Sequence, residues 1–372
     1  MAGVYLSYPF CAQKCTYCNF ASGVFPRPIE RRYLEALRAE IAGFAWSWRP
    51  QTVYLGGGTP SRIEPHDLEA LLSVIPGHPW SEATLEAAPG TLTRDQARLW
   101  SRLGINRVSL GVQSFVPREI NRTGRRHTAE SVAEEVAILR HAGIDNFNLD
   151  LIAGLPGQTP ESWRESLDWV ERLAAPHVSV YMLEVDEDSR LGREILHHGA
   201  RYGAPEAPSE DLTVELYQTA VERLRQMGIR QYEISNFARP GLESRHNLKY
   251  WRLEPYAGFG ADAHSFDGVM RHRNVESPAE YVARFQCGQS PGLESTPAQP
   301  REERFLVGLR LREGIRPTQQ EWRLFEAPIR RFVGDGLLES DGKNLRLTAQ
   351  GVLLSNEVLQ EFVSLEEGGN RV

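Results

Sequence analysis

Short runs of apolar and β-branched residues alternate with longer segments of helical period over the first two thirds of the chain. In the longer segments apolar residues recur every three to four positions, which is typical of amphipathic helices. Such alternation of strand and helix predicts a parallel sheet joined by helical crossovers. The predicted strands are GVYLSY near residue 3, TVYLGGG at 52, ATLEAAP at 83, RVSLGVQS at 107, NFNLDLIAGLP at 146 and HVSVYMLEV at 177.

The helical segments complete six strand–helix units. Six units predict an α/β fold built as a barrel or an incomplete barrel. In parallel barrels the reactive groups lie at the carboxyl ends of the strands. Functional residues are therefore expected directly after strands. The predicted helices are 31–44, 65–75, 93–104, 128–143, 159–173 and 210–228.

The pattern changes near residue 286. Residues 286–300 are rich in Pro, Gly and Ser and are predicted to be a linker, which leaves residues 1–285 as the barrel domain. Residues 301–372 contain two helical segments, a DGKN turn that predicts a hairpin, and a last helix. Helices followed by a hairpin predict a winged-helix-like domain. Its 11 basic and 12 acidic residues disfavour DNA binding.

Composition and charge narrow the class of protein. Of 372 residues, 41% are hydrophobic and 24% are charged, which is ordinary for a protein with a full core. No apolar run reaches about 18 residues, so no membrane span is predicted, and the N-terminus lacks a secretion signal. The net charge of −7 weighs against broad nucleic-acid binding. Four cysteines, three of them clustered, favour a reducing cytoplasm over a disulfide framework.

Three of the four cysteines follow the first predicted strand as CxxxCxxC: Cys11, Cys15 and Cys18. A structural zinc site needs four ligands, and no neighbouring Cys or His supplies the fourth. A [4Fe-4S] cluster held by three thiolates leaves one iron open to an outside ligand, whereas electron-transfer clusters usually have four protein ligands. Three free or buried thiols are the alternative. The spacing favours an iron–sulfur cluster with an open iron.

CxxxCxxC after the first strand resembles the radical S-adenosylmethionine superfamily. The resemblance implies a [4Fe-4S] cluster whose open iron binds the amino and carboxylate groups of S-adenosylmethionine. GGGTPS, residues 56–61, follows the second strand, and glycine lets the backbone approach a ligand closely. In the superfamily this loop contacts the methionine amino group, which implies binding roles for Gly57, Gly58 and Thr59. Glycine-rich turns after strands are common, so the loop alone is a weak signal.

Further segments are similar to the HemN/HemW group of coproporphyrinogen dehydrogenases and haem chaperones. They are YLSYPFCAQKCTYC, GGGTPS, LGVQSF, LDLIAGLPGQT and HNLKYW, together with the C-terminal domain. The resemblance implies an incomplete (β/α)6 TIM-like barrel followed by a winged-helix-like domain. It also implies contacts with S-adenosylmethionine, and with a second molecule of it in HemN. The positions for the first molecule include Tyr5, Tyr17, Glu86 and Met182, and those for the second are Gln113, Arg125 and Asp150.

Several of these residues also have an ordinary explanation. Asp150 can cap the loop before a helix, and Glu86 can be a solvated or paired acid. Gly57, Glu86, Gln113, Asp150 and Met182 nevertheless all fall at or just past the carboxyl end of a predicted strand. That shared position favours a common site at the mouth of the barrel.

Two departures separate dehydrogenases from chaperones within the group. The dehydrogenases have a further cysteine two residues after the third, where this chain has Phe20, and a sizeable segment before the first strand. HNLKYW, residues 246–251, matches HNxxYW, a signature of HemW. The resemblance is therefore closest to the HemW haem chaperones. A radical enzyme acting on a tetrapyrrole, such as a coproporphyrinogen III dehydrogenase, is the alternative, and a DNA-binding regulator is a distant third.

The resemblance implies that HNLKYW contacts haem. A neutral imidazole is a common protein ligand of haem iron, and aromatic rings can cover the macrocycle. In the alternative, the segment is a helical turn in which His246 is hydrogen-bonded and Trp251 belongs to the core. His264 and Cys287 are rival iron ligands. The residues expected at the haem are His246, Asn247, Tyr250 and Trp251.

The expected partners are haem and the proteins that accept it. The resemblance implies respiratory haem enzymes at the cytoplasmic membrane surface as acceptors. The chain shows no basic amphipathic helix that would anchor it there. The sequence thus predicts a cytoplasmic haem carrier with a [4Fe-4S] cluster and S-adenosylmethionine, and it does not predict decarboxylation of coproporphyrinogen III.

Overall fold

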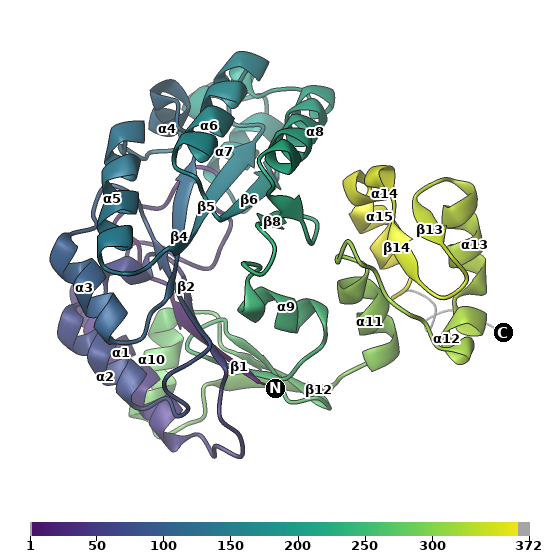
Figure 1. Cartoon of the computed structure of the whole chain (residues 1–372). Helices are drawn as coiled ribbons and strands as arrows, with labels where there is room; N and C mark the ends of the chain where they lie inside the picture. The colour runs from purple at the N-terminus through teal and green to yellow at the C-terminus, as the bar shows by residue number, and fades with distance from the viewer. Residues whose placement is uncertain (1, 364–372) are drawn as a thin grey trace.

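The computed structural model describes residues 2–363. An α/β fold occupies most of the chain, and a smaller unit at the C-terminus lies beside it (Figure 1). All six predicted strands are present, each within a few residues of its expected position. They are β1 (Gly3–Tyr8), β2 (Thr52–Gly57), β3 (Glu82–Ala87), β4 (Arg107–Gln113), β5 (Asn146–Ala153) and β6 (His177–Met182).

β1 to β6 lie in sequence order in one sheet, and each pairs in parallel with the next. Their carboxyl ends therefore lie along one rim. Within the described residues the sheet does not close on itself, because β6 pairs next with an antiparallel strand and β1 pairs with β9. The prediction of an incomplete (β/α)6 barrel is confirmed.

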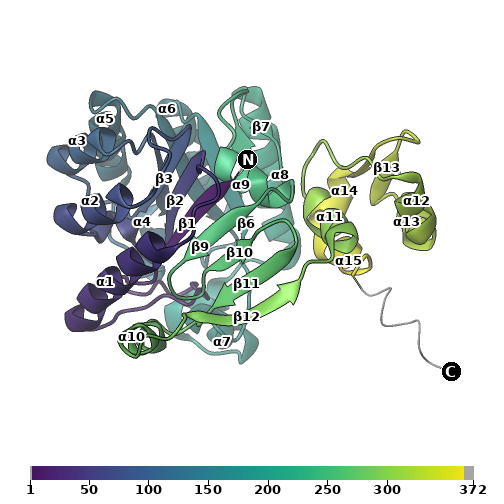
Figure 2. The same cartoon turned by 90° about the horizontal axis from the view of Figure 1, so that it is seen from below.

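Helices cover the outer face of this sheet (Figures 1 and 2). α3, α5 and α6 each begin after a threonine, at Thr93, Thr128 and Thr159, whose side chain accepts a hydrogen bond from the backbone three residues later. The side chain of that later residue returns the bond, so a local sequence signal fixes each N-terminus. The helices of this part are α1 (Arg27–Gly43), α2 (Pro65–Ser73), α3 (Arg94–Arg102), α4 (Pro117–Arg122), α5 (Ala129–His141), α6 (Pro160–Arg172), α7 (Arg190–Leu196) and α8 (Glu210–Gln226).

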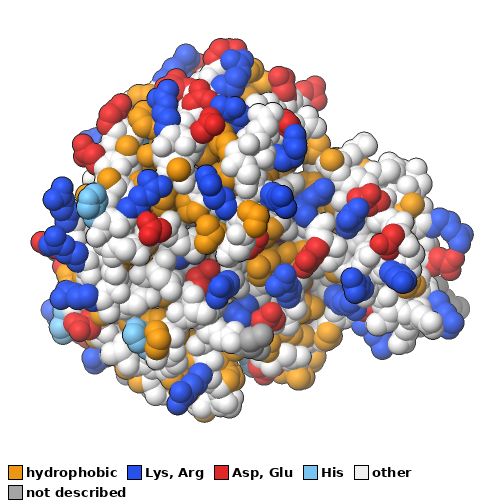
Figure 3. All heavy atoms as spheres, viewed as in Figure 1, with side chains coloured by type: hydrophobic (Ala, Val, Ile, Leu, Met, Phe, Trp, Pro, Cys, Tyr) orange, Lys and Arg blue, Asp and Glu red, His pale blue; other side chains and the backbone are white. Residues whose placement is uncertain are grey.

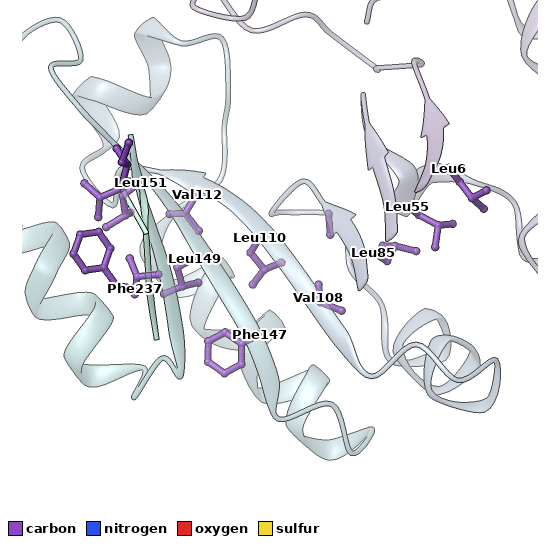
Figure 4. Packing of buried hydrophobic residues seen from close by; sticks show 14 of the residues in the cluster. Leu6, Leu55, Leu85, Val108, Leu110, Val112, Phe147, Leu149, Leu151 and Phe237 are labelled. Carbon is purple, nitrogen blue, oxygen red and sulfur yellow. The ribbon is translucent and has the colours of Figure 1, made fainter. Parts of the chain in front are cut away.

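The two faces of the strands differ in chemistry because alternate side chains point to opposite faces. Outward side chains are apolar and buried against the helices, and Figure 4 shows Leu6, Leu55, Leu85, Val108 and Leu149 among them. The hydrophobic core therefore lies between the sheet and the helices, and the barrel interior is largely polar. The inward residues include Tyr5, Tyr54, Glu86, Arg107, Ser109, Asn148, Asp150, His177 and Ser179.

Short elements that the sequence pattern did not predict extend the sheet at both edges. On one side β9 pairs in parallel with β1 and is followed by antiparallel β10, β11 and β12, and on the other side β8 and β7 follow β6. The expected linker, residues 286–300, is not free of structure, because β12 lies within it and pairs with β11. The added elements are β7 (Arg230–Gln231), β8 (Asn236–Ala238), α9 (Arg245–Trp251), β9 (Tyr256–Phe259), β10 (His264–Phe266), β11 (Met270–Asn274), α10 (Pro278–Gln286) and β12 (Gly292–Pro297).

The C-terminal unit contains a group of buried aromatic rings, which belongs to the same hydrophobic core as the barrel residues. Phe305, Phe325 and Phe362 are buried there, with ring centroids 4.4 to 5.4 Å apart. The hairpin predicted at DGKN forms between β13 and β14. Helices and a hairpin thus occur in the order expected of a winged-helix-like domain. The elements are α11 (Pro300–Gly308), α12 (Gln319–Leu324), α13 (Glu326–Gly334), β13 (Leu338–Ser340), β14 (Leu345–Leu347), α14 (Ala349–Leu353) and α15 (Ser355–Gln360).

The surface of the described part carries both signs of charge. Figure 3 shows Lys and Arg interspersed with Asp and Glu across one face, including the C-terminal unit. Within residues 2–363 no helix is both long enough and apolar enough to cross a bilayer.

Candidate functional site

The segment that carries Cys11, Cys15 and Cys18 begins just after β1 ends, at the carboxyl rim of the barrel. The Cys11 N–H donates to the Gly23 carbonyl at 2.8 Å, which closes the segment into a loop. All three thiols are half-buried. Burial raises the pKa of Cys11, and the neighbouring Cys18 and Cys15 raise it further. The three predicted ligands therefore lie near one another at the mouth.

Three thiols on one short loop fit a [4Fe-4S] cluster. In such a cluster each thiolate binds a different iron, so the sulfur atoms need not converge on one point. Among residues 2–363 no three His, Cys, Asp or Glu side chains are grouped closely enough to hold a metal ion. A closed zinc site would bring four donors around one ion. The donor set thus fits a cluster with an open iron better than zinc.

The glycine-rich loop lies directly against the cysteine segment. The Gly58 N–H donates to the Tyr8 carbonyl at 2.7 Å, and the Thr59 N–H donates to the Phe10 carbonyl at 3.0 Å. A Cβ at Gly58 would lie 2.6 Å from the Phe10 carbonyl oxygen, and Gly57 has a φ of +112°. Neither position accepts a side chain without displacement or strain. These glycines therefore place the loop against the end of β1.

Glu86 stands near the end of β3 and is held by two donors. The Tyr54 hydroxyl donates to Oε1 at 2.8 Å, and the Gly57 N–H donates to Oε2 at 3.0 Å. Burial raises the pKa of Glu86 to about 7, and the charge of Asp150 acts in the same direction while the two donors oppose it. Glu86 is thus not a solvated surface acid. Beside the glycine loop, its carboxylate can accept hydrogen bonds from an ammonium or a hydroxyl group of a ligand.

Asp150 and Gln113 come from the neighbouring strands β5 and β4. Asp150 accepts from the Ser109 hydroxyl at 3.1 Å and from the Asn148 amide at 2.7 Å, and burial raises its pKa. The bond from Ser109 joins it to the neighbouring strand β4, so it does not cap a helix. Gln113 has a φ of +71°, a conformation that residues other than glycine rarely adopt. Such strain is often found at binding sites.

Arg125 brings a positive charge against the cysteine segment. Its Nε donates to the Cys15 sulfur at 3.2 Å, and its guanidinium also donates to the Gly111 carbonyl. Tyr17 is adjacent, and burial raises its pKa while Arg125 lowers it. The structure therefore places Arg125 and Tyr17 beside Cys15, one of the three predicted cluster ligands.

Tyr5 and Met182 lie at different depths of the barrel. Tyr5 is in the middle of β1, and its ring stacks on that of Tyr54 with centroids 6.1 Å apart. Met182 ends β6 opposite Ala153 of β5. Met182 is therefore at the rim, and Tyr5 is below it.

HNLKYW forms α9, which enters the barrel from the opposite, amino end of the strands. His246 is fully buried. Its Nδ1 lies 2.8 Å from the hydroxyl of Thr52 at the start of β2, and its Nε2 lies 2.8 Å from the Tyr250 hydroxyl. Glu82, at the start of β3, accepts from the His246 N–H at 2.9 Å. An imidazole that binds iron needs a free ring nitrogen, so this conformation matches the hydrogen-bonded alternative and does not offer His246 as a haem ligand.

The rings of Tyr250 and Trp251 also have partners within the protein, and the backbone of Asn247 belongs to the first turn of α9. The Tyr250 ring packs edge-on against Tyr256 with centroids 4.7 Å apart, and the guanidinium of Arg310 lies 4.6 Å from the Trp251 ring centroid. The Asn247 N–H donates to the Ser244 hydroxyl at 3.3 Å. α9 thus lies between the barrel and the C-terminal unit (Figure 1).

Sequence reasoning missed the residues that connect the two ends of the barrel. Tyr54 donates to Glu86, and its ring centroid lies 5.3 Å from that of His246. Arg107 is buried in the interior, and within residues 2–363 its Nε has no hydrogen-bond partner. A signal was available, because polar residues occupy every second position of β3 and of the first halves of β4 and β5.

Comparison with known proteins identifies the families that both parts of the chain match. Residues 5–170 match the Radical SAM superfamily, and residues 296–354 match the HemN C-terminal domain. The superfamily implies a [4Fe-4S] cluster and S-adenosylmethionine. The solved structure of coproporphyrinogen III oxidase (HemN) from Escherichia coli aligns with a TM-score of 0.82 at 22% identity, over 98% of this chain and 90% of that one, which shows a shared fold.

Full-length relatives narrow the family further. The chain is 33% identical to Heme chaperone HemW from Lactococcus lactis subsp. lactis, over 96% of each chain. It is 30% identical to the mitochondrial Radical S-adenosyl methionine domain-containing protein 1 from Bos taurus, over 98% of this chain and 87% of that one. The chain therefore belongs to the HemW family of the radical SAM superfamily.

Proposed function

We propose that this protein is a haem chaperone, which binds haem and transfers it to acceptor haem proteins. The observation that carries the proposal is the similarity to proteins named Heme chaperone HemW along nearly the whole chain. Phe20 supports the same choice, because it is 67% exposed on the cysteine segment at the position where the dehydrogenases have a further cysteine. Haem enzymes at the cytoplasmic membrane surface are the acceptors that we propose.

The carboxyl rim supports the cofactor part of the proposal. Cys11, Cys15 and Cys18 would hold the [4Fe-4S] cluster, which when bound supplies an electron to the sulfonium of S-adenosylmethionine. Gly58 keeps the backbone of the glycine loop close to these cysteines. Glu86 presents a carboxylate to the same mouth, where it can hold the ligand's ammonium or ribose hydroxyl groups. The residues of this chain would thus bind and orient the cofactor.

Haem contact through α9 would require a rearrangement. His246 would have to break its bonds to Thr52 and Tyr250 before either ring nitrogen could reach iron. Glu82 also holds the first turn of α9 at the barrel. The proposed haem contact of His246, Asn247, Tyr250 and Trp251 therefore implies that α9 leaves the barrel.

The function can be tested with anaerobically reconstituted protein that is offered haem and coproporphyrinogen III side by side, with reductant and S-adenosylmethionine. We expect bound haem, seen as a shifted Soret band, that moves to an added apo-haem protein. We also expect no decarboxylated product. Multiple turnovers of coproporphyrinogen III without bound haem would contradict the proposal and favour the dehydrogenase. A Cys11, Cys15 and Cys18→Ala variant shows which result depends on the cluster.

A further inference from the structure

α9 is held from two sides, by the barrel and by the C-terminal unit (Figure 1). On the barrel side, His246 bonds to Thr52 and to Tyr250. At the last residue of the helix, the guanidinium of Arg310 lies 4.6 Å from the centroid of the Trp251 ring, and α11 packs against α9. The proposed haem contact requires that α9 leaves the barrel, so these contacts with the C-terminal unit must also break.

The segment that follows α11 contacts both ends of α9. At the C-terminal end of the helix, Glu313 forms an ion pair with Arg252 at 3.1 Å. The N-terminal end is reached through Tyr232. Its carbonyl accepts from the Arg312 N–H at 3.0 Å, and its hydroxyl accepts from the N–H of Ser244, the N-cap of α9, at 3.3 Å. One short segment of the C-terminal unit is thus placed to hold or to free the whole helix.

The junction between α9 and the C-terminal unit is polar and incompletely bonded. Arg310 Nη2 lies 3.8 Å from Oε2 of the buried Glu233, which is long for a charge-assisted hydrogen bond. Within residues 2–363 three buried atoms at this junction have no hydrogen-bond partner: Arg310 Nε, Glu233 Oε2 and Trp251 Nε1. Burial raises the pKa of Glu233, while the charge of Arg310 lowers it. Because unpaired buried polar groups cost free energy, this contact is weaker than a fully bonded one and is suited to opening.

We propose that the C-terminal unit is a latch that holds α9 in the barrel, and that haem reaches HNLKYW only when this latch opens. The latch residues are Arg310, Arg312 and Glu313. This inference rests on the proposed chaperone function and adds the control of its haem site. In the closed conformation both ring nitrogens of His246 are bonded, so haem would bind the minor population in which α9 is free.

Control of this kind suits a carrier that both takes up haem and releases it. The apparent affinity for haem is lowered in proportion to the fraction of molecules in which α9 is free. Weakening the latch therefore raises that fraction and tightens haem binding by the same factor. Return of α9 to the barrel restores the bonds of His246 and so favours release of haem to an acceptor.

Hydrogen–deuterium exchange of the reconstituted full-length protein without haem tests the latch directly. The variants are Arg310→Ala and Arg310→Ala combined with Glu233→Gln, which avoids leaving a buried carboxylate without its cation. The matched control is Arg330→Ala, because Arg330 is an exposed arginine of the same unit that pairs with Glu326 within α13. Iron content and circular dichroism must first show that each variant keeps the cluster and the fold.

We expect the amide protons of residues 245–251 to exchange about two- to thirtyfold faster in both latch variants, the range that corresponds to the loss of one cation–π contact. The amides of β5 should exchange at the wild-type rate, because the opening is local. Arg330→Ala should match the wild type in both regions. Unchanged exchange of α9 in both latch variants overturns the inference, and so does equal acceleration in α9 and β5, which would show a general loss of stability.

Haem titration of the same proteins, followed by the absorption spectrum, separates this inference from the function on which it rests. Both latch variants should bind haem more tightly than the wild type, by about the factor measured in exchange, and Arg330→Ala should not. If the wild type and the variants bind no haem, the proposed function fails, and the exchange result still decides whether the latch exists. If α9 opens in the latch variants and haem binding does not tighten, control of haem access by the latch is overturned.

Discussion

The two ends of the barrel use similar residue types in opposite ways. At the amino end, Thr52, Glu82 and His246 bond to one another or to the α9 backbone, and little of them reaches solvent. At the carboxyl rim, the side chains of Cys11, Cys15 and Cys18 are half-buried, and the pKa of Glu86 is raised. The amino end of the barrel is closed by α9, which we call the plug. The carboxyl rim presents groups that a ligand can contact.

This difference shows which polar groups serve the fold and which can serve a ligand. A buried polar group costs free energy unless it has a partner, so groups paired within the protein serve stability. His246 illustrates this point. It belongs to the HNxxYW motif, and both of its ring nitrogens form hydrogen bonds within the protein. A motif that is shared within a family can therefore stabilise the closed end of a barrel and need not lie at the open end that binds ligands.

The largest effect is expected at the rim. Replacing Cys11, Cys15 and Cys18 together with Ala should abolish the reconstituted cluster, because no other thiol lies on that loop. Iron content and the broad visible absorbance measure the loss. Cys287→Ala is the control and should change neither, since Cys287 is exposed after α10. Retention of about four irons in the triple variant would refute the assignment of the cluster.

At the plug, His246→Ala should lower the free energy of unfolding by about 3 kcal/mol. The change leaves a cavity and removes the partners of the Thr52 and Tyr250 hydroxyls, each of which costs about 1–3 kcal/mol when left unpaired. Denaturant unfolding measures it. His272→Ala on the hairpin of β10 and β11 is the control, with an expected change within about 0.5 kcal/mol. Equal stability of the two variants would show that α9 is not a plug.

Binding of S-adenosylmethionine should depend on pH through Glu86. Its pKa is about 7, so the ionised fraction rises from roughly one tenth at pH 6 to roughly nine tenths at pH 8, and affinity should rise up to about tenfold. Isothermal titration at several pH values measures this, and Glu86→Gln should remove the dependence. Because the folded pKa lies above the ordinary 4.5, the same group should lower the stability of the unliganded protein as pH rises from 4.5 to 7. A flat affinity profile in the wild type would remove Glu86 from the site.

The smallest effect concerns Tyr54, which touches both ends. Tyr54→Phe keeps the ring against His246 and removes the hydrogen bond to Glu86. That bond lowers the pKa of Glu86, so the midpoint of the pH profile should move upward, with a cost of about 0.5–1.5 kcal/mol in stability. Tyr5→Phe is the matched control, because Tyr5 stacks on Tyr54 and no hydrogen bond joins it to Glu86 in the described residues. An identical profile in both variants would mean that the Tyr54 hydroxyl does not influence the pKa of Glu86.

Local patterns in the sequence predicted the rim well and the plug poorly. The strand ends at Gly57, Glu86 and Met182 follow from periodicity and turn residues, which are local signals. The place of α9 depends on the contacts of His246 with Thr52 of β2 and Glu82 of β3, which lie 194 and 164 positions earlier in the chain. No local pattern encodes such a contact.

Pairing between strands far apart in the sequence explains the other differences between the predicted and the observed fold. β9 joins the sheet beside β1, and β12 forms in a stretch that is rich in Pro, Gly and Ser and was expected to be a linker. A strand of four to six residues with an exposed face shows little alternation of apolar and polar residues. Such a strand forms because it pairs with a neighbouring strand, and the sequence pattern alone does not predict it. The polar lining of the barrel could have been recognised from alternate residues such as Ser109, Asn148 and Ser179.

The most direct test of the account is the electron paramagnetic resonance spectrum of the reduced, reconstituted protein during titration with S-adenosylmethionine. A cluster held by three cysteines at an open rim has one iron free, so the signal should change and saturate near one equivalent of ligand. Glu86→Gln should require more ligand for the same change. A signal that stays unaltered at saturating S-adenosylmethionine would contradict an open iron at this rim and with it the contrast between the two ends of the barrel.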